Sequence, residues 1–360
     1  MTVNSTDDYQ QHLWVKDIKE EDSVRGCYLV KGKKMGTTRR STPFISLTLA
    51  DRTGEIEAKV WDRAEEFSSV FREGDVVELE GHAGSYRGQI QITVSGLRPV
   101  RGEMDPDIFL ESTPMDPSEM MKSLRHSLRE VKDAHLRTLN ESFLNDREFV
   151  SLFKKAPAAK RFHHNYLGGL LEHTLSVCRL TKQVAEHYPQ LDCDLLLTGA
   201  FLHDIGKIKE LACHLKFDYT DEGRLLGHVM LSVTMVEEKI TEAKDFPRDL
   251  AIRLKHLILS HHGEYEFGSP KRPKFLEAFA LHLVDDLDAK INGLGRFMER
   301  DRQEGAWTDY NRLFGRYFLK GEILPVEKET DEGIGAVEGQ QMLFTTDSDL
   351  QSKRRLDSSH

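Results

Sequence analysis

Cysteine is scarce in this chain of 360 residues, with four scattered residues and no CxxC pair. Isolated thiols of this kind are typical of a reducing compartment and do not indicate a disulfide framework. No apolar run approaches the roughly 20 residues of a membrane-spanning helix. The polar start, Met1–Asp8, lacks the basic and apolar pattern of a signal peptide. We therefore expect a cytoplasmic protein without a membrane span.

Basic residues are outnumbered by acidic ones, 50 to 60, which gives a net charge of −10. This balance does not exclude a nucleic-acid partner, because a local basic patch can bind a polyanion within an acidic protein. Histidine, in contrast, is plentiful: sixteen are present, most of them between His163 and His282. This clustering raises the question of a metal site in that region.

Residues 12–101 alternate short apolar runs with turns, a pattern typical of β-structure. Five runs predict strands: 23–30, 44–49, 55–61, 75–81 and 89–94. A short helix is expected over 64–71. Five strands with one short helix fit a small closed barrel, and the OB-fold is the leading candidate.

The segment Leu49–Trp61 resembles the strand-turn-strand hairpin of nucleic-acid-binding OB-folds of the tRNA-anticodon type. Such domains bind single strands with aromatic platforms and a basic groove. The loop 31–40 holds five basic residues and no acid, and we interpret it as contacting phosphates. Candidate nucleic-acid contacts in this domain are Lys33, Lys34, Arg39, Arg40, Phe44, Lys59, Trp61, Tyr86 and Arg87, with Tyr28 as a further aromatic candidate. For each single aromatic residue the alternative is a place in the barrel core.

The remaining chain divides by composition. A linker with three prolines is expected over 102–118, because proline and acidic residues accumulate there. Only helical periodicity and loops follow, which predicts an all-α domain over 119–325. Residues 1–11 and the acidic tail 326–360 are expected to be disordered. Within the tail, Gln340–Phe344 resembles the peptide that many bacterial DNA-handling proteins insert into the replication sliding clamp, although a chance apolar cluster is the alternative.

The all-α domain contains polar residues that interrupt apolar helical segments. A lone pair such as His203–Asp204 is more often a core histidine beside a helix cap than a metal site. Here five histidines and two acids recur in this setting: His173, His203, Asp204, His228, His261, His262 and Asp285. Burying so much polarity without compensation would be costly. A shared metal centre accounts for it.

This order resembles the signature of the HD-domain metal-dependent phosphohydrolases. His173, the pair His203–Asp204 and the distant Asp285 match the basic ligand set of that family. The three further histidines match the additional ligands of members that hold two metals. Asp285 is preferred to Asp286 and Asp288 because the first acid of the phrase Val-Asp-x-Leu-Asp-Ala-Lys aligns with the family ligand, and Asp286 is the alternative.

The resemblance implies a divalent metal centre, with manganese, iron, cobalt, nickel or zinc all compatible with these ligands. Two ions bridged by Asp204 would generate a metal-bound hydroxide that attacks a phosphodiester. Lys207 would stabilise the transition state, unless it is a surface lysine at a helix end. The loop 265–273, with Lys271 and Arg272, is interpreted as contacting substrate, and a simple helix connector is the alternative.

Together, the two halves resemble the YhaM-type 3′-to-5′ exoribonucleases of bacteria. That resemblance implies degradation of single-stranded RNA, with single-stranded DNA as a further candidate substrate. Two alternatives stay open. One is an HD-type phosphohydrolase of a nucleotide or cyclic dinucleotide, and the other is a non-catalytic single-strand-binding protein.

Overall fold

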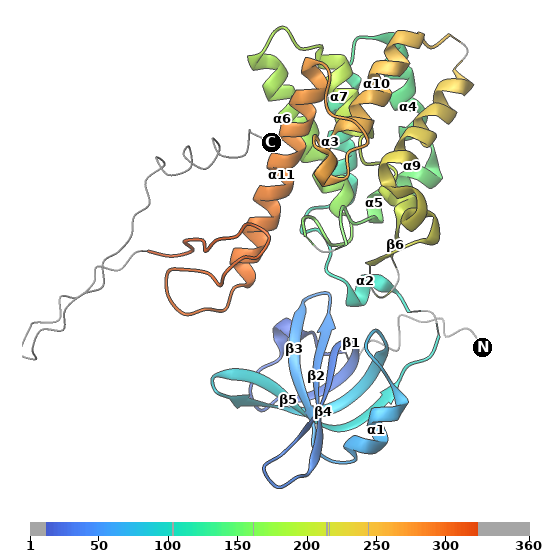
Figure 1. Cartoon of the computed structure of the whole chain (residues 1–360). Helices are drawn as coiled ribbons and strands as arrows, with labels where there is room; N and C mark the ends of the chain where they lie inside the picture. Colours follow the sequence, from blue (N-terminus) through green and yellow to red (C-terminus); the bar gives the residue numbers. More distant parts are fainter. Residues whose placement is uncertain are drawn as a thin grey trace, which may run out of the picture. The chain divides into compact units, whose positions relative to one another are not determined.

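The computed structural model describes residues 12–102, 104–160, 162–213, 215, 217–243 and 245–322. The described residues divide into two units, one up to Arg300 and one from Asp301 onward. The first unit contains a β-barrel and a helical bundle (Figure 1). The clamp-like peptide Gln340–Phe344 lies outside the described residues. Among the described helices, none combines the length and apolar character needed to cross a bilayer.

The N-terminal barrel consists of five strands: β1 Ser23–Thr37, β2 Pro43–Asp51, β3 Gly54–Val60, β4 Val76–Tyr86 and β5 Gln89–Pro99. Their order around the barrel is β1-β2-β3-β5-β4, and β4 closes it by pairing with β1. All pairs are antiparallel except β3 with β5. Helix α1, Ala64–Val70, connects β3 to β4, and the short 3₁₀ turn η2, Val15–Asp17, precedes β1. The prediction of an OB-fold barrel is confirmed.

Side-chain alternation in β2 and β3 separates the barrel core from its outer face. Ile45, Leu47 and Leu49 are fully buried, and their partners from β3 are also buried. Successive side chains of a strand point to opposite faces, so Phe44 and Lys59 point outward. The strand pattern therefore places an aromatic and a basic side chain together on the barrel surface.

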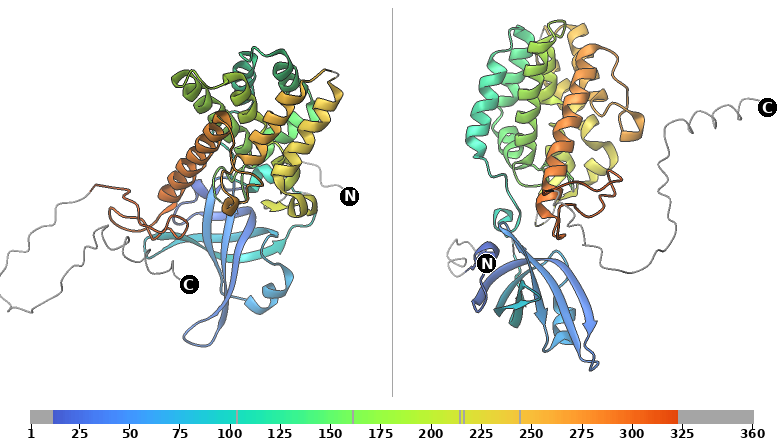
Figure 2. Two further views of the ribbon diagram at one scale, coloured as in Figure 1. Left: turned by 45° about the horizontal axis from the view of Figure 1, so that its top comes forward. Right: turned by 90° about the vertical axis from the view of Figure 1, so that its left-hand side faces the viewer.

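The helical bundle comprises α2 Pro106–Phe109, α3 Pro117–Arg129, α4 Ala134–Leu144, α5 Arg147–Lys155, α6 Gly169–His187, α7 Cys193–Leu202, α8 Lys207–Glu210, α9 Asp221–Glu242, α10 Arg248–Ser260 and α11 Leu276–Arg300. Figure 2 shows its long helices running alongside one another. Aspartates accept hydrogen bonds from backbone N–H groups at the starts of α2, α3, α4, α5 and α7, which defines where these helices begin.

Three details differ from the sequence prediction. Two short strands, β6 Leu211–Cys213 and β7 Phe217–Tyr219, form a hairpin inside the helical domain. The expected linker contains the one-turn helix α2 and the start of α3. Strand β1 continues to Thr37, so most of the expected loop 31–40 is part of a strand. Residues 301–322, which belong to the second unit, form turns with two isolated bridges, Trp307–Leu319 and Asn311–Arg316.

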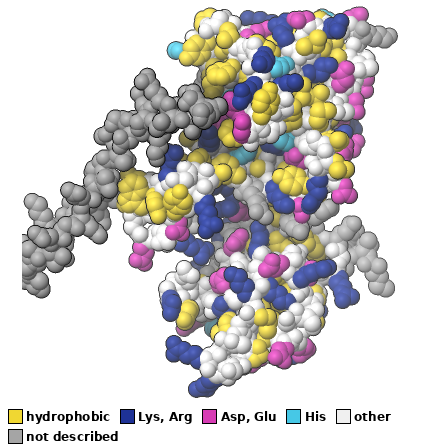
Figure 3. Space-filling model, in the orientation of Figure 1, with side chains coloured by type: hydrophobic (Ala, Val, Ile, Leu, Met, Phe, Trp, Pro, Cys, Tyr) yellow, Lys and Arg dark blue, Asp and Glu magenta, His cyan; other side chains and the backbone are white. Residues whose placement is uncertain are grey.

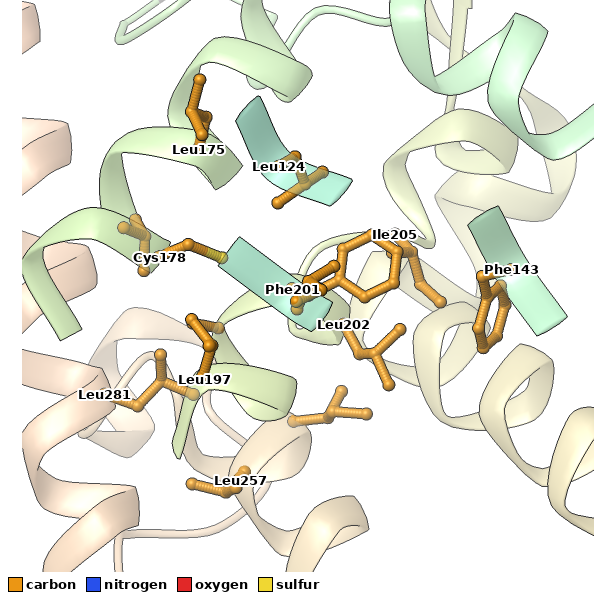
Figure 4. Packing of buried hydrophobic residues seen from close by; sticks show 14 of the residues in the cluster. Leu124, Phe143, Leu175, Cys178, Leu197, Phe201, Leu202, Ile205, Leu257 and Leu281 are labelled. Atoms are coloured by element: carbon orange, nitrogen blue, oxygen red, sulfur yellow. The ribbon is translucent and has the colours of Figure 1, made fainter. Parts of the chain in front are cut away.

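Helix α7 runs through the core of the bundle. All residues from Leu195 to Leu202 are buried. Phe201 packs edge-on against three phenylalanines of α4 and α5, with ring centroids 6.1–6.3 Å apart, and it lies within the labelled cluster of Figure 4. Because His203 directly follows this buried helix, the packing of α7 carries a polar side chain into the interior.

Candidate metal centre and nucleic-acid interface

Five histidines and two aspartates meet inside the bundle: His173, His203, Asp204, His228, His261, His262 and Asp285. One residue each comes from α6, α9 and α11, and the other four directly follow α7 and α10. The structure thus brings together all seven residues that the sequence pattern singled out.

The rings of His203 and His261 are oriented by the helices that precede them. The last carbonyls of an α-helix lack a backbone partner. His203 Nδ1–H donates to the carbonyl of Ala200 at 2.8 Å, and His261 Nδ1–H donates to that of Ile258 at 2.7 Å. Each ring therefore turns its Nε2 away from its own helix and toward the centre.

The other three rings are also held through Nδ1. Their acceptors are Asp288 for His173 at 2.7 Å, Glu210 for His228 at 3.1 Å and the Phe267 carbonyl for His262 at 3.0 Å. A histidine ligand whose second nitrogen donates to a carboxylate or carbonyl is fixed in both tautomer and orientation. All five Nε2 lone pairs are thereby directed at one place.

Two glycines allow His228 to reach this place. Gly227 interrupts α9 with φ of 72°, a left-handed conformation that favours glycine. Gly206 packs so closely against α9 that an added Cβ would lie 2.2 Å from the backbone oxygen of His228. Neither position would tolerate a side chain without moving His228.

Asp204 lies between two groups of ligands. Its Oδ2 is 3.4 Å from His203 Nε2 and 3.6 Å from His173 Nε2. Its Oδ1 is 3.4 Å from His228 Nε2 and 3.5 Å from His261 Nε2. Each carboxylate oxygen therefore faces its own pair of imidazoles.

Asp285 and His262 complete the two groups. Asp285 Oδ1 is 3.1 Å from His173 Nε2 on the first side. His262 Nε2 is 3.3 Å from His228 Nε2 on the second. Asp286, the alternative ligand, instead pairs with Lys290 at 2.7 Å.

The donor atoms fit a bound cation. Asp204 Oδ1 and His261 Nε2 are buried and have no hydrogen-bond partner among the described residues. His173 Nε2 and His203 Nε2 lie 3.3 Å apart, yet both are acceptors when Nδ1 carries the proton. Buried acceptors that face one another without a donor are costly. Divalent metals that prefer imidazole and carboxylate ligands would satisfy them.

Electrostatics at the centre favour charged carboxylates. Burial would raise the pKa of Asp204, but Lys207 and His203 outweigh it and hold the pKa well below its ordinary value. Burial opposes protonation of His203, yet Asp204 and Asp285 raise its pKa to about 10, and the same two carboxylates would favour a metal cation in place of that proton. Burial, with His261 and His228 nearby, lowers the pKa of His262 to about 3, so this ring is neutral and ready to coordinate.

Lys207 is a buried residue of the centre. Its side chain is 8% exposed, and Nζ lies 2.5 Å from Asp204 Oδ2. Lys207 also lines a cavity of about 160 Å³ with Asp204, Asp285 and His163. A surface position at a helix end, the alternative for this lysine, does not match its burial.

Several residues of the site lie outside the predicted ligand set. Asp288 accepts hydrogen bonds from His173 and Ser176, and Glu210 accepts from both the backbone and the ring of His228. Asp288 could have been found, since it lies three residues from Asp285 on the same face of α11. Glu210 could not, because only the tertiary fold brings it to His228. His163 lines the cavity with its Nδ1 unpartnered among the described residues.

On the barrel, Phe44 and Trp61 form an aromatic pair on the outer face, with ring centroids 4.9 Å apart. Lys59 Nζ lies 5.7 Å from the Phe44 ring centroid. Trp61 is 42% exposed. The strand alternation thus assembles three of the predicted contacts into one surface suited to stacking a base.

The other predicted contacts on the barrel differ in exposure. Lys34, Arg39, Arg40, Tyr86 and Arg87 are exposed. On the face shown in Figure 3, Lys and Arg side chains are scattered over the barrel among Asp and Glu and form no single patch.

Two residues of the barrel have structural roles. Lys33 Nζ donates to the carbonyls of Ser68 and Phe71, which ties β1 to α1 and its end. Tyr28 is fully buried and its hydroxyl donates to the Leu13 carbonyl. The interpretation of Tyr28 as a platform is therefore wrong, because this ring belongs to the core.

The loop after His262 contains the 3₁₀ turn η3, Tyr265–Phe267. Arg272 pairs with Glu264 at 2.7 Å and lies over the Tyr265 ring, while Lys271 is exposed. Phe267 is 65% exposed and lines the cavity at the centre. The loop therefore offers an aromatic surface directly beside the metal ligands.

A helical bundle with this His/Asp set, preceded by a five-stranded barrel, defines an HD-type phosphohydrolase that carries an OB-fold domain. Family models match accordingly: the HD domain over residues 170–290 and the OB-fold nucleic acid binding domain of the tRNA anticodon type over residues 28–100. The HD domain implies dependence on a divalent metal, and the OB-fold implies binding of single-stranded nucleic acid.

Similar proteins extend over both domains. The 3′-5′ exoribonuclease YhaM of Bacillus subtilis is 38% identical over 80% of this chain and 91% of that protein. The proteins of the same name from Shouchella clausii and Listeria innocua are 37% and 35% identical, over 78% and 83% of this chain and 87% and 94% of theirs. A solved OB-fold domain of replication protein A from Methanococcus maripaludis matches 26% of this chain and 99% of that chain, at 20% identity and a TM-score of 0.22. The chain belongs to the YhaM family of HD-domain phosphohydrolases.

Proposed function

We propose that this chain is a metal-dependent 3′-to-5′ exoribonuclease that degrades single-stranded RNA and, as a second substrate, single-stranded DNA. Its relatives are named for the RNA activity and share both domains with it. One observation carries the proposal: of five imidazoles held through Nδ1, four place Nε2 3.4–3.6 Å from the two oxygens of Asp204, and the fifth, His262, places it 3.3 Å from His228 Nε2. This arrangement suits two divalent ions.

The proposed roles follow from these positions. His173, His203 and Asp285 would hold one ion, and His228, His261 and His262 the other, with Asp204 between them. Ions bound there would activate water for attack on the phosphodiester and neutralise charge that develops on its oxygens.

Lys207 and the nearby aromatic residues would position the substrate. Lys207 adds a fixed positive charge at the cavity, where it would stabilise the phosphoryl oxygens. Phe267 would stack on the terminal base, since base–aromatic stacking is tolerant of sequence. Phe44 and Trp61, with Lys59 nearby, would hold bases of the same strand on the barrel. We also propose a cytoplasmic location and these domain boundaries: OB-fold 12–101, linker 102–118 and HD domain 119–325.

The test uses purified protein with 5′-labelled single-stranded RNA or DNA and manganese. We expect a ladder of products shortened from the 3′ end. His203→Ala and Asp204→Ala should abolish the ladder, whereas His187→Ala, an exposed histidine on the helix that carries His173, should leave it unchanged. No shortening of either polymer with any of the five metals would refute the proposal.

A sliding-clamp contact through Gln340–Phe344 is proposed separately, from the sequence of that peptide alone. Binding of the full chain to the clamp should be lost when Leu343 and Phe344 are both replaced by alanine. If the full chain does not bind the clamp, the proposed clamp contact is refuted and the nuclease proposal is unaffected.

A further inference from the structure

A second cavity, of about 830 Å³, lies away from the metal ligands and is lined by cations of two helices. Arg125 comes from α3, and Arg147, Lys154 and Lys155 come from α5. Arg52 also lines it, and one acid, Asp107, is present. In a chain with a net charge of −10, five cations against one acid is a strong local reversal.

These cations are not used to neutralise acids of the protein. Elsewhere on the bundle, lysines pair with carboxylates, as Lys182 does with Glu130 at 2.6 Å and Lys255 with Glu237 at 2.7 Å. Across the described residues, by contrast, none of the four helical cations of the cavity forms an ion pair. Lys154 donates to the Ser118 hydroxyl at 3.0 Å and Arg125 donates to the Leu144 carbonyl, and both of these partners are neutral.

One of the two acids adjacent to Arg147 in the sequence, Asp146, is already occupied. Asp146 accepts from the backbone N–H groups of Glu148 and Phe149 and thereby caps α5. It also lies 3.5 Å from Lys239. The positive charge of the cavity is therefore left for a ligand.

The spacing of the cations indicates a ligand with more than one phosphate. Arg147 and Lys155 are the first and last residues of α5, about 12 Å apart at 1.5 Å per residue. A cavity of about 830 Å³ along this length has room for more than one phosphate group. The cavity also includes Gly168, which directly precedes α6, the helix that carries His173. The cavity therefore lies near the N-terminal end of α6, which is the end closer to this metal ligand.

We propose that this cavity binds consecutive backbone phosphates of the single-stranded RNA substrate, away from the cleaved end. The inference rests on the proposed exoribonuclease function for its ligand. Basic side chains that contact phosphates hold a strand without reading its sequence, which suits an enzyme that degrades many RNAs.

The test measures binding of a labelled 20-nucleotide RNA in EDTA, where no turnover occurs, at several salt concentrations. The double variant Arg147→Gln/Lys155→Gln removes two phosphate-binding charges. It should reduce the slope of log affinity against log salt by roughly 1.4, since each phosphate neutralised on a single strand contributes about 0.7. The control Lys122→Gln/Arg129→Gln removes two exposed charges from α3 outside the cavity and should leave the slope unchanged.

Further arms separate the outcomes. Cleavage of a dinucleotide should be equal in parent and cavity variant, because the dinucleotide does not extend beyond the metal centre. The charge-conserving variant Arg147→Lys/Lys155→Arg should show the parental slope.

An unchanged slope in a variant with the parental melting temperature overturns the inference even if the parent degrades RNA. Loss of tripolyphosphate binding with unchanged RNA binding also overturns it and assigns the cavity to a free polyphosphate. If the parent protein binds RNA through the cavity but never shortens it, the exonuclease proposal is refuted and the RNA-binding cavity stands. If the double variant does not fold, Lys155→Gln alone should lower the slope by roughly 0.7.

Discussion

Asp51 in the barrel and Asp204 in the helical bundle are equally buried, each 2% exposed, but their surroundings differ. Asp51 accepts hydrogen bonds from Val15 N–H and from the backbone and hydroxyl of Thr53, and His12 lies 3.2 Å away. Asp204 is paired with Lys207 through one oxygen, while its other oxygen has no hydrogen-bond partner among the described residues. The protein alone satisfies the first carboxylate and leaves the second incomplete.

This difference separates a structural acid from a functional one. A buried acceptor without a donor lowers stability and persists where a ligand compensates it. In the barrel, the interior is filled by apolar side chains, and the candidate binding residues Phe44, Lys59 and Trp61 lie on the outer face. In the bundle, the interior itself is the site. Burial therefore does not identify a functional carboxylate, whereas an unfilled hydrogen-bonding capacity does.

The largest expected effect contrasts two neighbouring acids of α11. Asp285→Asn removes a carboxylate that lies 3.1 Å from His173, and RNA degradation should fall by more than about 100-fold, beyond the loss typical of an outer-shell residue. Asp286→Asn should retain activity, because Asp286 pairs with Lys290 at 2.7 Å. Rates of RNA shortening at saturating manganese check both. Equal losses in the two variants would contradict the assignment of Asp285.

The next effect concerns metal affinity. Asp288→Asn weakens the group that orients His173, and metal affinity should fall about 10–100-fold. Calorimetric titration of the metal-free protein measures this directly. Excess manganese should restore activity in Asp288→Asn and fail to restore it in Asp285→Asn. If excess metal does not rescue Asp288→Asn, the acid acts in some way other than through His173.

On the barrel, the expected effect is on substrate binding. Trp61→Ala should cost about 1–3 kcal/mol of affinity for single-stranded RNA, because one stacked base loses its platform. KM should rise while kcat on a short oligonucleotide stays the same. Tyr86→Ala, at the exposed hairpin tip, tests a second predicted aromatic contact in the same binding assay. Unchanged binding in Trp61→Ala would contradict a role of the Phe44–Trp61 surface in RNA binding.

The smallest effect is on the stability of the barrel. In Asp51→Asn an amide NH₂ replaces one acceptor oxygen, so a backbone N–H of Val15 or Thr53 loses its partner. Unfolding free energy should fall by on the order of 1 kcal/mol. Two of the three tryptophans, Trp14 and Trp61, report on the barrel and none lies between residues 102 and 300, so their fluorescence follows this transition.

The same acid predicts a pH dependence. Burial would raise the pKa of Asp51, but hydrogen bonds from His12, Thr53 and Val15 outweigh it and lower the pKa below its ordinary value of 3.8. A depressed pKa stabilises the fold above the unfolded value, and that contribution is lost as pH falls through the folded value. The stability difference between parent and Asp51→Asn should therefore narrow below pH 3.8. A constant difference down to pH 2 would contradict this origin.

Much of the fold follows from local pattern. Alternating Ile45, Leu47 and Leu49 predict a strand with one buried face, and the structure agrees because a pleated strand has a period of two. Local pattern does not reveal the β6–β7 hairpin, since three-residue strands are too short to show a period.

The amino-acid sequence alone identifies which residues form the candidate metal centre, because each of the seven interrupts an apolar helical segment and their order resembles one family. How these residues are held depends on the tertiary structure. The ring of His173 is oriented by Asp288 and that of His228 by Glu210, each from another segment, and the ring of His262 is oriented by the backbone carbonyl of Phe267. The helical cations of the second cavity likewise come from two separate helices. Local periodicity reports which face of a helix is buried. It carries no information about which side chains from distant segments meet there, since that depends on how the helices pack.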